Sequence, residues 1–209
     1  QDVAISSNSV SDVTLDTPAV VLGAAWADVA STATTTISGG ATITAGDDVS
    51  IDSSATNNMD VGVSSGGSVF GIAGNFLKIP GATLSLAYGK ARTISSTDIQ
   101  DGATVTAGTA LNPGDVVITA HNADDFSVKA ISKATPSSSL GLAVGVAISD
   151  TESTTTAHVA GDVTASGNVT VDATALNIDN DVQANAVIKK SVIGQIAEKA
   201  GSKLGSLGS

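Results

Sequence analysis

Acidic side chains are the residues of this chain whose type and spacing could do chemistry. All but two of the 20 acidic residues are Asp, and Asp47, Asp48 and Asp52 lie within six positions. Calcium takes six to eight oxygen ligands, which acidic turns supply. These three residues are therefore candidate calcium ligands, although neither an EF-hand loop nor a Gly-Gly-x-Gly-x-Asp repeat is present. The alternative is that they cap turns and keep the surface soluble.

Other side chains offer little for catalysis. The two histidines, His121 and His158, stand in no catalytic motif, so we expect both on the surface. Carbohydrate-cleaving sites combine acids with basic and aromatic partners. Arg92 is the single arginine, and aromatic residues are 2% of the chain. We expect no enzyme activity and no cofactor other than the calcium considered above.

Charge and composition argue against several further classes of protein. The formal net charge is −11, which disfavours nucleic acid as a partner because phosphates would be repelled. Without cysteine, the chain has neither a disulfide framework nor a thiolate metal site. Its apolar runs fall well short of the roughly 18 residues that a membrane span needs. With so few aromatic residues, the core must be filled by Ala, Val, Ile, Leu, Thr and Gly.

Internal repeats indicate the architecture. Ile37–Gly46 and Ile99–Gly108 are closely similar and lie 62 residues apart, and Gly161–Gly167 is a shorter third copy. Each copy is followed by a second motif, which begins Asp48-Val-Ser-Ile, Asp115-Val-Val-Ile or Asn168-Val-Thr-Val. Small or apolar residues alternate with polar ones inside the motifs, which is typical of half-buried strands. The offset favours stacked coils over hairpins, with like residues about 4.8 Å apart.

The repeats predict an all-β fold, a parallel β-helix (β-solenoid) of roughly 60-residue units. We expect each unit to form three coils of about 20 residues. Residues 1–180 are divided into a partial unit at 1–19 and units near 20–81, 82–141 and 142–180. Gly66–Gly81 and Pro136–Leu140 interrupt the pattern and are expected to be loops.

The C-terminal part has a different pattern of apolar residues from the repeats. Apolar residues recur every four positions at Ala184, Ile188, Val192 and Ile196, which predicts an amphipathic helix over 181–201. Such a helix could cover the open end of the stack. Residues 202–209 are rich in Gly and Ser and are expected to be flexible.

Two side-chain patterns have alternative interpretations. Trp26, Tyr88 and Ile148 occupy equivalent positions, and we expect them to be stacked core, with an exposed docking patch as the alternative. Threonine pairs could order water on a flat face and bind ice, by analogy with other β-solenoids, or could simply suit strands. These pairs are Thr34/Thr36, Thr42/Thr44 and Thr104/Thr106.

The repeat segments ATITAGDDVSIDSSA and GDVTASGNVTVDATA, together with the stretch around Val144–Ile148, resemble repeats of giant secreted bacterial adhesins. Filamentous-haemagglutinin-like proteins and autotransporter passengers are the comparison, over roughly residues 1–180. The resemblance implies a right-handed parallel β-helix, secretion to the cell surface and a role in adhesion or biofilm structure. It supplies no catalytic residues.

These observations predict a structural or adhesive segment that acts as a stiff acidic spacer or surface. Its partners would be neighbouring repeats, copies of itself, or a host or matrix glycan or protein. The alternative is a self-assembling subunit of an extracellular fibre, in which the end of one stack pairs with the start of the next. Ice-binding and calcium-binding modules are the further possibilities.

Overall fold

The computed structural model describes residues 1–19, 22–67, 82–135 and 141–189. Within these ranges the chain forms strands, turns and bends and has no helix. Long strands build two parallel sheets. The four strands of sheet A are β1 (Val3–Ala19), β4 (Val49–Gly67), β7 (Val116–Ala134) and β10 (Val169–Ile188). The three strands of sheet B are β2 (Leu22–Ile37), β5 (Ala82–Ile99) and β8 (Leu142–Val159).

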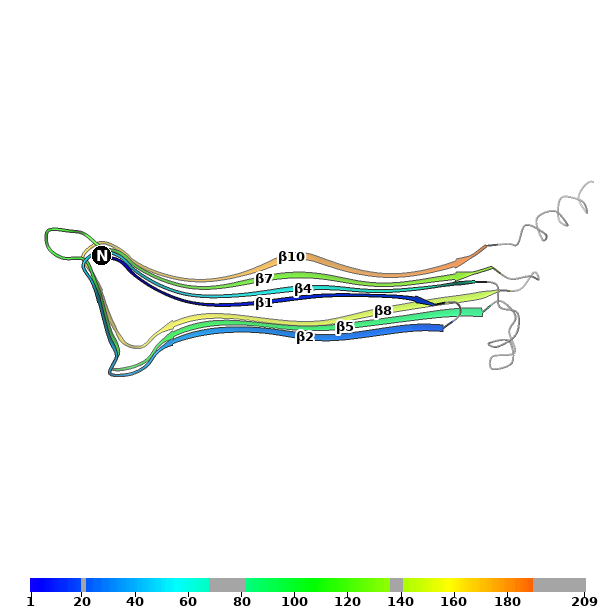
Figure 1. Cartoon of the computed structure of the whole chain (residues 1–209), viewed down its shortest axis with the longest axis horizontal. Coiled ribbons are helices and arrows are strands. Elements are labelled where there is room, and N and C mark those ends of the chain that lie inside the picture. The colour runs from blue at the N-terminus through cyan, green and yellow to red at the C-terminus, as the bar shows by residue number, and fades with distance from the viewer. Residues whose placement is uncertain (20–21, 68–81, 136–140, 190–209) are drawn as a thin grey trace, which may run out of the picture.

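Sheet C is short, and it is made of β3 (Thr42–Ala45), β6 (Thr104–Ala107) and β9 (Asp162–Ala165). The chain visits sheets A, B and C in turn and then returns to A, so each pass adds one parallel strand to each sheet. In Figure 1, sheets A and B run as two long layers, and sheet C lies at the end of the molecule where the N-terminus is. This all-β arrangement is consistent with a β-helix.

The strand register follows the sequence repeat. Leu22 pairs with Leu84 and Trp26 with Tyr88, while Ile43 pairs with Val105 and Val105 with Val163. One 60-residue unit therefore makes a single pass through the three sheets, so the expectation of three 20-residue coils per unit is wrong. The long strands explain the error, since the 16 to 20 residues of each strand in sheets A and B are about three times a usual strand length.

These strand lengths give the molecule its flat shape. At about 3.3 Å per residue a long strand extends about 55–65 Å, whereas each added strand widens a sheet by only about 4.8 Å. The longest dimension in Figure 1 accordingly lies along the strands and not along the stacking direction. The molecule presents broad, flat outer faces.

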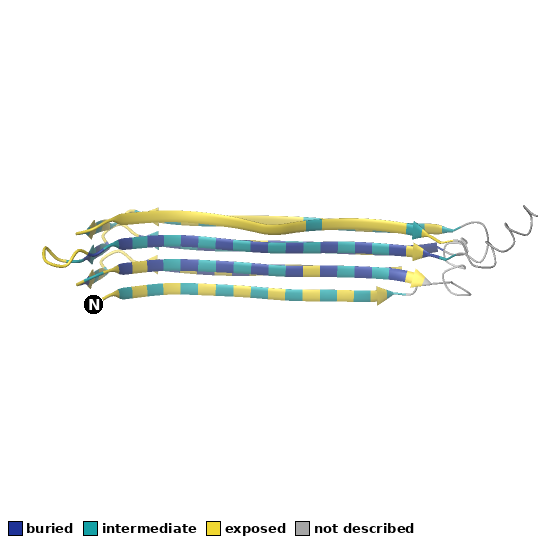
Figure 2. Ribbon diagram, turned by 90° about the horizontal axis from the view of Figure 1, so that it is seen from above, coloured by how far each residue is buried: buried dark blue, intermediate teal, exposed yellow. Residues whose placement is uncertain are grey.

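Apart from an irregularity at Asn177/Asp179, alternation places every second side chain of the long strands between the sheets, as the bands on the inner strands of Figure 2 show. Two apolar clusters fill this interior. One lies between sheets A and B around Met59, Val61 and Phe126, and the other adjoins sheet C around Ile51, Ile99 and Val105. Between the clusters runs a polar seam, which includes the buried residues Ser31, Asn57, Thr93, Asn122 and Asp124, with Ser153 at its open end.

Tight turns connect sheets B and C. Gly40 and Gly102 both have positive φ, at 82° and 78°, a conformation that glycine adopts without a steric penalty. The two glycines stack on each other, because the amide of Gly40 donates to the carbonyl of Gly102 at 2.9 Å. The turns are thus repeated from one pass to the next, as the strands are.

The predicted C-terminal helix is wrong for residues 181–188, which belong to β10. Val182, Ala184 and Ile188 pair with Val128, Ala130 and Ala134 of β7, so they continue inward-facing columns. A spacing of four residues is also a multiple of two, and it therefore fits one face of a strand as well as one face of a helix. Residues 190–201 of the predicted helix lie outside the described residues, as do most of the two expected loops and the 202–209 tail.

Candidate functional site

The outer face of sheet B carries three chemically different regions along its strands. Next to the start of the strands is an apolar block, made of Leu22, Ala24, Trp26, Leu84, Leu86, Tyr88, Val144, Val146 and Ile148. The middle holds a charge block of Asp28, Lys90, Arg92, Asp150 and Glu152. Near sheet C lies a threonine-rich region with Thr32, Thr34, Thr36, Thr154 and Thr156.

The apolar block is open to solvent. Trp26 is 69% exposed and Ile148 46% exposed, and the Trp26 and Tyr88 rings stand 4.4 Å apart at 40°. The expectation that this column is core is therefore wrong, and the alternative of an exposed patch is correct. Apolar patches of this kind often mark interaction sites.

The sequence contains a signal that this face points outward. Ala25, Ala27 and Val29 alternate with the large residues and are buried against the opposite sheet. Because this stretch is apolar on both faces, alternation of polarity cannot say which face points inward. Side-chain size does, since the space between two closely packed sheets accepts the small residues.

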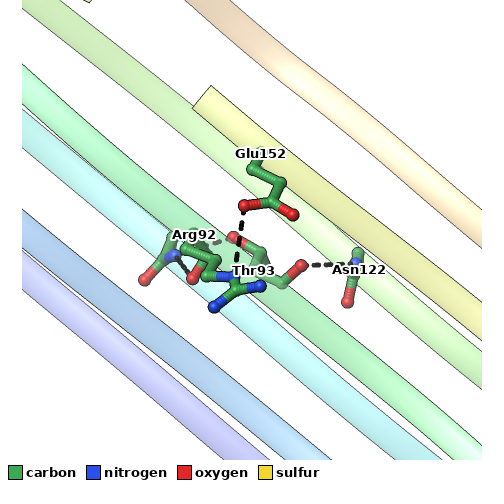
Figure 3. A network of polar contacts seen from close by, with 5 residues as sticks. Arg92, Thr93, Asn122 and Glu152 are labelled. Atoms are coloured by element: carbon green, nitrogen blue, oxygen red, sulfur yellow. Dashed lines mark hydrogen bonds and ion pairs between the residues drawn. The ribbon is translucent and has the colours of Figure 1, made fainter. Parts of the chain in front are cut away.

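The charge block contains an ion pair between Arg92 and Glu152, whose Nε and Oε2 atoms are 3.2 Å apart (Figure 3). Both side chains are more than half exposed, so the pair contributes little to stability. Lys90 lies between Asp28 and Asp150 on the neighbouring strands. The block thus separates the apolar surface from the threonine-rich one.

Threonine pairs also face outward from sheet C. Thr42 pairs with Thr104, and Thr44 with Thr106, but Asp162 takes the equivalent position next to Thr104 in the third strand. Each strand of sheet C has only four residues, so this threonine array is narrow. Ice binding stays a prediction.

The outer face of sheet A is acidic. Its outward positions include Asp12, Asp16, Asp52, Asp60, Asp125, Asp172, Asp179 and Asp181. The Nζ of Lys129 lies 3.0 Å from Oδ2 of Asp181. The hydrogen bond that Lys129 donates holds the pKa of the Asp181 carboxyl below its ordinary value, and the same bond raises the pKa of Lys129.

The calcium candidates are brought together only in part. Carboxylate oxygens of Asp47 and Asp48 lie within 4.8 Å of each other and of Asp2, whereas Asp52 is not part of this group. Asp52 instead accepts a hydrogen bond from the hydroxyl of Thr119 on the outer face of sheet A. Asp48 is one of a column of turn residues, since Asp2, Asp48, Asp115 and Asn168 each directly precede the paired valines at the start of the sheet A strands.

Carboxylates in this column cap the turn of the next pass. Oδ1 of Asp48 accepts the amide of Asp115 at 2.8 Å, and Oδ1 of Asp115 accepts the amide of Asn168 at 2.6 Å. This geometry favours the turn-capping interpretation for Asp48, and calcium binding at Asp47, Asp48 and Asp52 stays a prediction.

The two histidines lie on opposite outer faces. His158 is on sheet B, where its Nδ1 is 2.8 Å from Oδ1 of Asp98. His121 is on the outer side of sheet A. The structure does not bring the two residues together.

Both ends of the stack are open within the described residues. Strands β1 and β10 each have one neighbour in sheet A, and inward-facing residues of β10 such as Val169 and Val171 are 49% and 48% exposed. A shallow hollow at the β8–β10 end is lined by residues of both long sheets. These are Asp124, Phe126, Thr151, Ser153, Ala175, Leu176 and Asn177.

Comparisons with protein families, with curated proteins and with solved structures found no match. In the described part of the chain, no helix is long and apolar enough to cross a membrane.

Proposed function

We propose that this chain is a structural and adhesive β-solenoid segment of an exported surface or extracellular protein. The observation that carries the proposal is the apolar block, a flat and solvent-exposed surface repeated over three paired strands. The three strands that carry this surface are paired in sheet B, and the inner face of sheet B packs on sheet A. The surface is therefore held in place by the sheet behind it. The resemblance of the repeats to secreted adhesins supports the location.

The shape favours an adhesive surface over a spacer. One unit of about 60 residues extends the stack by only about 4.8 Å, so a long reach would need very many units. The same unit adds a strip about 55–65 Å long to each outer face. Many weak contacts along such faces would add up to firm attachment, as multivalency requires.

Binding of the purified chain to immobilised surfaces tests this function. The panel contains apolar-coated beads, glycan arrays and extracellular-matrix proteins. We expect retention on at least one of them, and a loss of most of it in Trp26→Thr/Val146→Thr. Val10→Thr is the matched control, because Val10 is 63% exposed but lies on the outer face of sheet A. Equal retention of all three proteins would contradict an adhesive role for the apolar block.

A self-assembling fibre subunit is the second candidate, and the exposed inward-facing residues of β10 favour it. Unpaired backbone on β1 and β10 could accept a strand from another copy. Two features disfavour such pairing, because proline and bulges at a sheet edge hinder the addition of another strand. These are Pro18 in β1 and the irregularity at Asn177/Asp179 in β10. Electron microscopy of the purified chain distinguishes the candidates, since fibres support the subunit and single particles support the segment.

A further inference from the structure

Asp124 is unusual within the interior of the protein. In the described ranges it is the single ionisable side chain that points between sheets A and B, and it is 4% exposed. Thr93 donates a hydrogen bond from its hydroxyl to Oδ1 of Asp124 at 2.5 Å. Burying a carboxylate is costly unless its charge is compensated.

Nearby cations are already engaged outside the interior. Arg92 is adjacent to Thr93 in sequence, but its side chain lies on the outer face of sheet B with Glu152 (Figure 3). Lys129 is on the outer face of sheet A and pairs with Asp181. Within the described residues, no basic side chain reaches the carboxylate of Asp124.

The surroundings of Asp124 contain more oxygen acceptors than donors. Asn57 is the register partner of Asp124 on β4, and Asn122 lies two residues before it on β7. The Oδ1 atoms of both asparagines are buried and have no hydrogen-bond donor. Their Nδ2 atoms donate to backbone carbonyls, Asn57 to Arg92 at 3.0 Å and Asn122 to Thr154 at 2.8 Å, which fixes the orientation of each amide.

Asp124 also lines the hollow at the open end of the stack, which has a volume of about 150 Å³. Thr151, Ser153 and Asn177, whose side chains carry hydroxyl and amide groups, line the same hollow. The hollow is large enough for a small ion with bound water. A buried carboxylate and residues with further oxygen groups thus line the hollow, and the unpaired amide oxygens belong to Asn57 and Asn122, which are neighbours of Asp124 in the polar seam.

We propose that this hollow binds a monovalent metal cation, Na⁺ or K⁺, with Asp124 as the charged ligand. A single positive charge neutralises the single carboxylate, whereas a divalent ion would leave a net positive charge on a site with only one charged ligand. Oxygen ligands suit such hard cations. The site is distinct from the group formed by Asp2, Asp47 and Asp48.

Thermal unfolding of the full chain in different chloride salts tests the site. NaCl and KCl are compared with tetramethylammonium chloride at equal ionic strength, so that general screening is the same. At a tenfold excess of metal ion over its dissociation constant, the folding equilibrium shifts about tenfold, which raises Tm by about 4 °C. We expect this difference between the salts in the natural sequence and its loss in Asp124→Asn.

Asp125→Asn is the matched control, because it removes the same charge from the outer face one residue away. This variant should keep the full difference in Tm between the metal chlorides and tetramethylammonium chloride. Broadening of the ²³Na NMR signal by the natural protein gives an independent readout that needs no variant. Equal Tm values in all three salts, or a salt difference that survives in Asp124→Asn, would overturn the proposal.

Discussion

Trp26 stacks on Tyr88 across two neighbouring strands of sheet B, with ring centroids 4.4 Å apart and both side chains on the outer face. These residues lie 62 positions apart in the sequence. Their contact therefore exists only because successive passes of the chain pair in register. It also places an aromatic pair on a surface and not in the core, which gives the protein its candidate adhesive region.

The exposure of Trp26 is directly measurable, because it is the single tryptophan of the chain. We expect a red-shifted emission maximum and efficient quenching by acrylamide, since the side chain is 69% exposed. Acrylamide is uncharged and so is not repelled by the acidic protein. A blue-shifted emission that acrylamide fails to quench in the folded protein would place the residue in the core after all.

Turn capping predicts a stability effect at Asp115. Its Oδ1 accepts the amide of Asn168, so Asp115→Ala should lower the free energy of unfolding by about 1 kcal/mol, as loss of a comparable helix cap does. Asp115→Asn should cost less, because an amide oxygen can accept the same bond, as Asx turns show. Denaturant unfolding measures both variants. An equal loss of unfolding free energy in Asp115→Ala and Asp115→Asn would show that the charge of Asp115, and not its capping hydrogen bond, stabilises the protein.

Close packing of the interior predicts a cost at Gly89. A Cβ atom at this position would lie 2.6 Å from Cε of Met59 and 2.8 Å from Cγ2 of Val128. Gly89→Ala should therefore destabilise the protein by about 1–3 kcal/mol through overpacking. Gly66→Ala is the control, since the nearest atom to its added Cβ is at an ordinary 3.6 Å. A neutral Gly89→Ala variant would mean that sheets A and B are farther apart than described.

The all-β class and the stacking of like residues could be predicted from the sequence, but the number of residues in each coil could not. The similarity of Ile37–Gly46 to Ile99–Gly108 predicts that like residues stack in columns, and the pairing of Ile43 with Val105 confirms this. The short motifs do not show that strands continue far beyond them. Beyond Ile51, for example, β4 runs on through Ser53 and Asn57, whose polar side chains point inward.

The sites were harder to predict than the pairing, and the interior polar seam explains why. Asp124 and Asp125 are adjacent and chemically identical, yet one is buried and the other faces outward. The two residues differ only in which face of β7 they occupy. The sequence around them does not show which of the two faces meets sheet B. In the same way, Asp47 and Asp48 meet Asp2, which is remote in sequence, in place of the nearby Asp52.

Titration of Asp181 provides a prediction about pH. Hydrogen bonds from Lys129 and Gln183 hold the pKa of this carboxyl below its usual 3.8, so the stabilisation exists above that pH and is lost as the pH falls through the lowered pKa. Carboxyl NMR should show the pKa rising towards 3.8 in Lys129→Met. Because the pair is on the surface, high salt should weaken the effect. An unchanged pKa in Lys129→Met would show that Lys129 does not hold this carboxylate.

Disulfide trapping tests in-register stacking most directly, because the chain contains no cysteine of its own. Thr34 and Ser96 are register partners on the outer face of sheet B. Their Cα atoms are therefore about 4.8 Å apart, within the range that a disulfide bridges. Thr34→Cys/Ser96→Cys should oxidise rapidly within one chain. In Thr34→Cys/Ile94→Cys the Cα atoms are about 8 Å apart, so this pair should not form a bridge. Bridging of the second pair as fast as the first, or of neither pair in the folded protein, would contradict the stacked register.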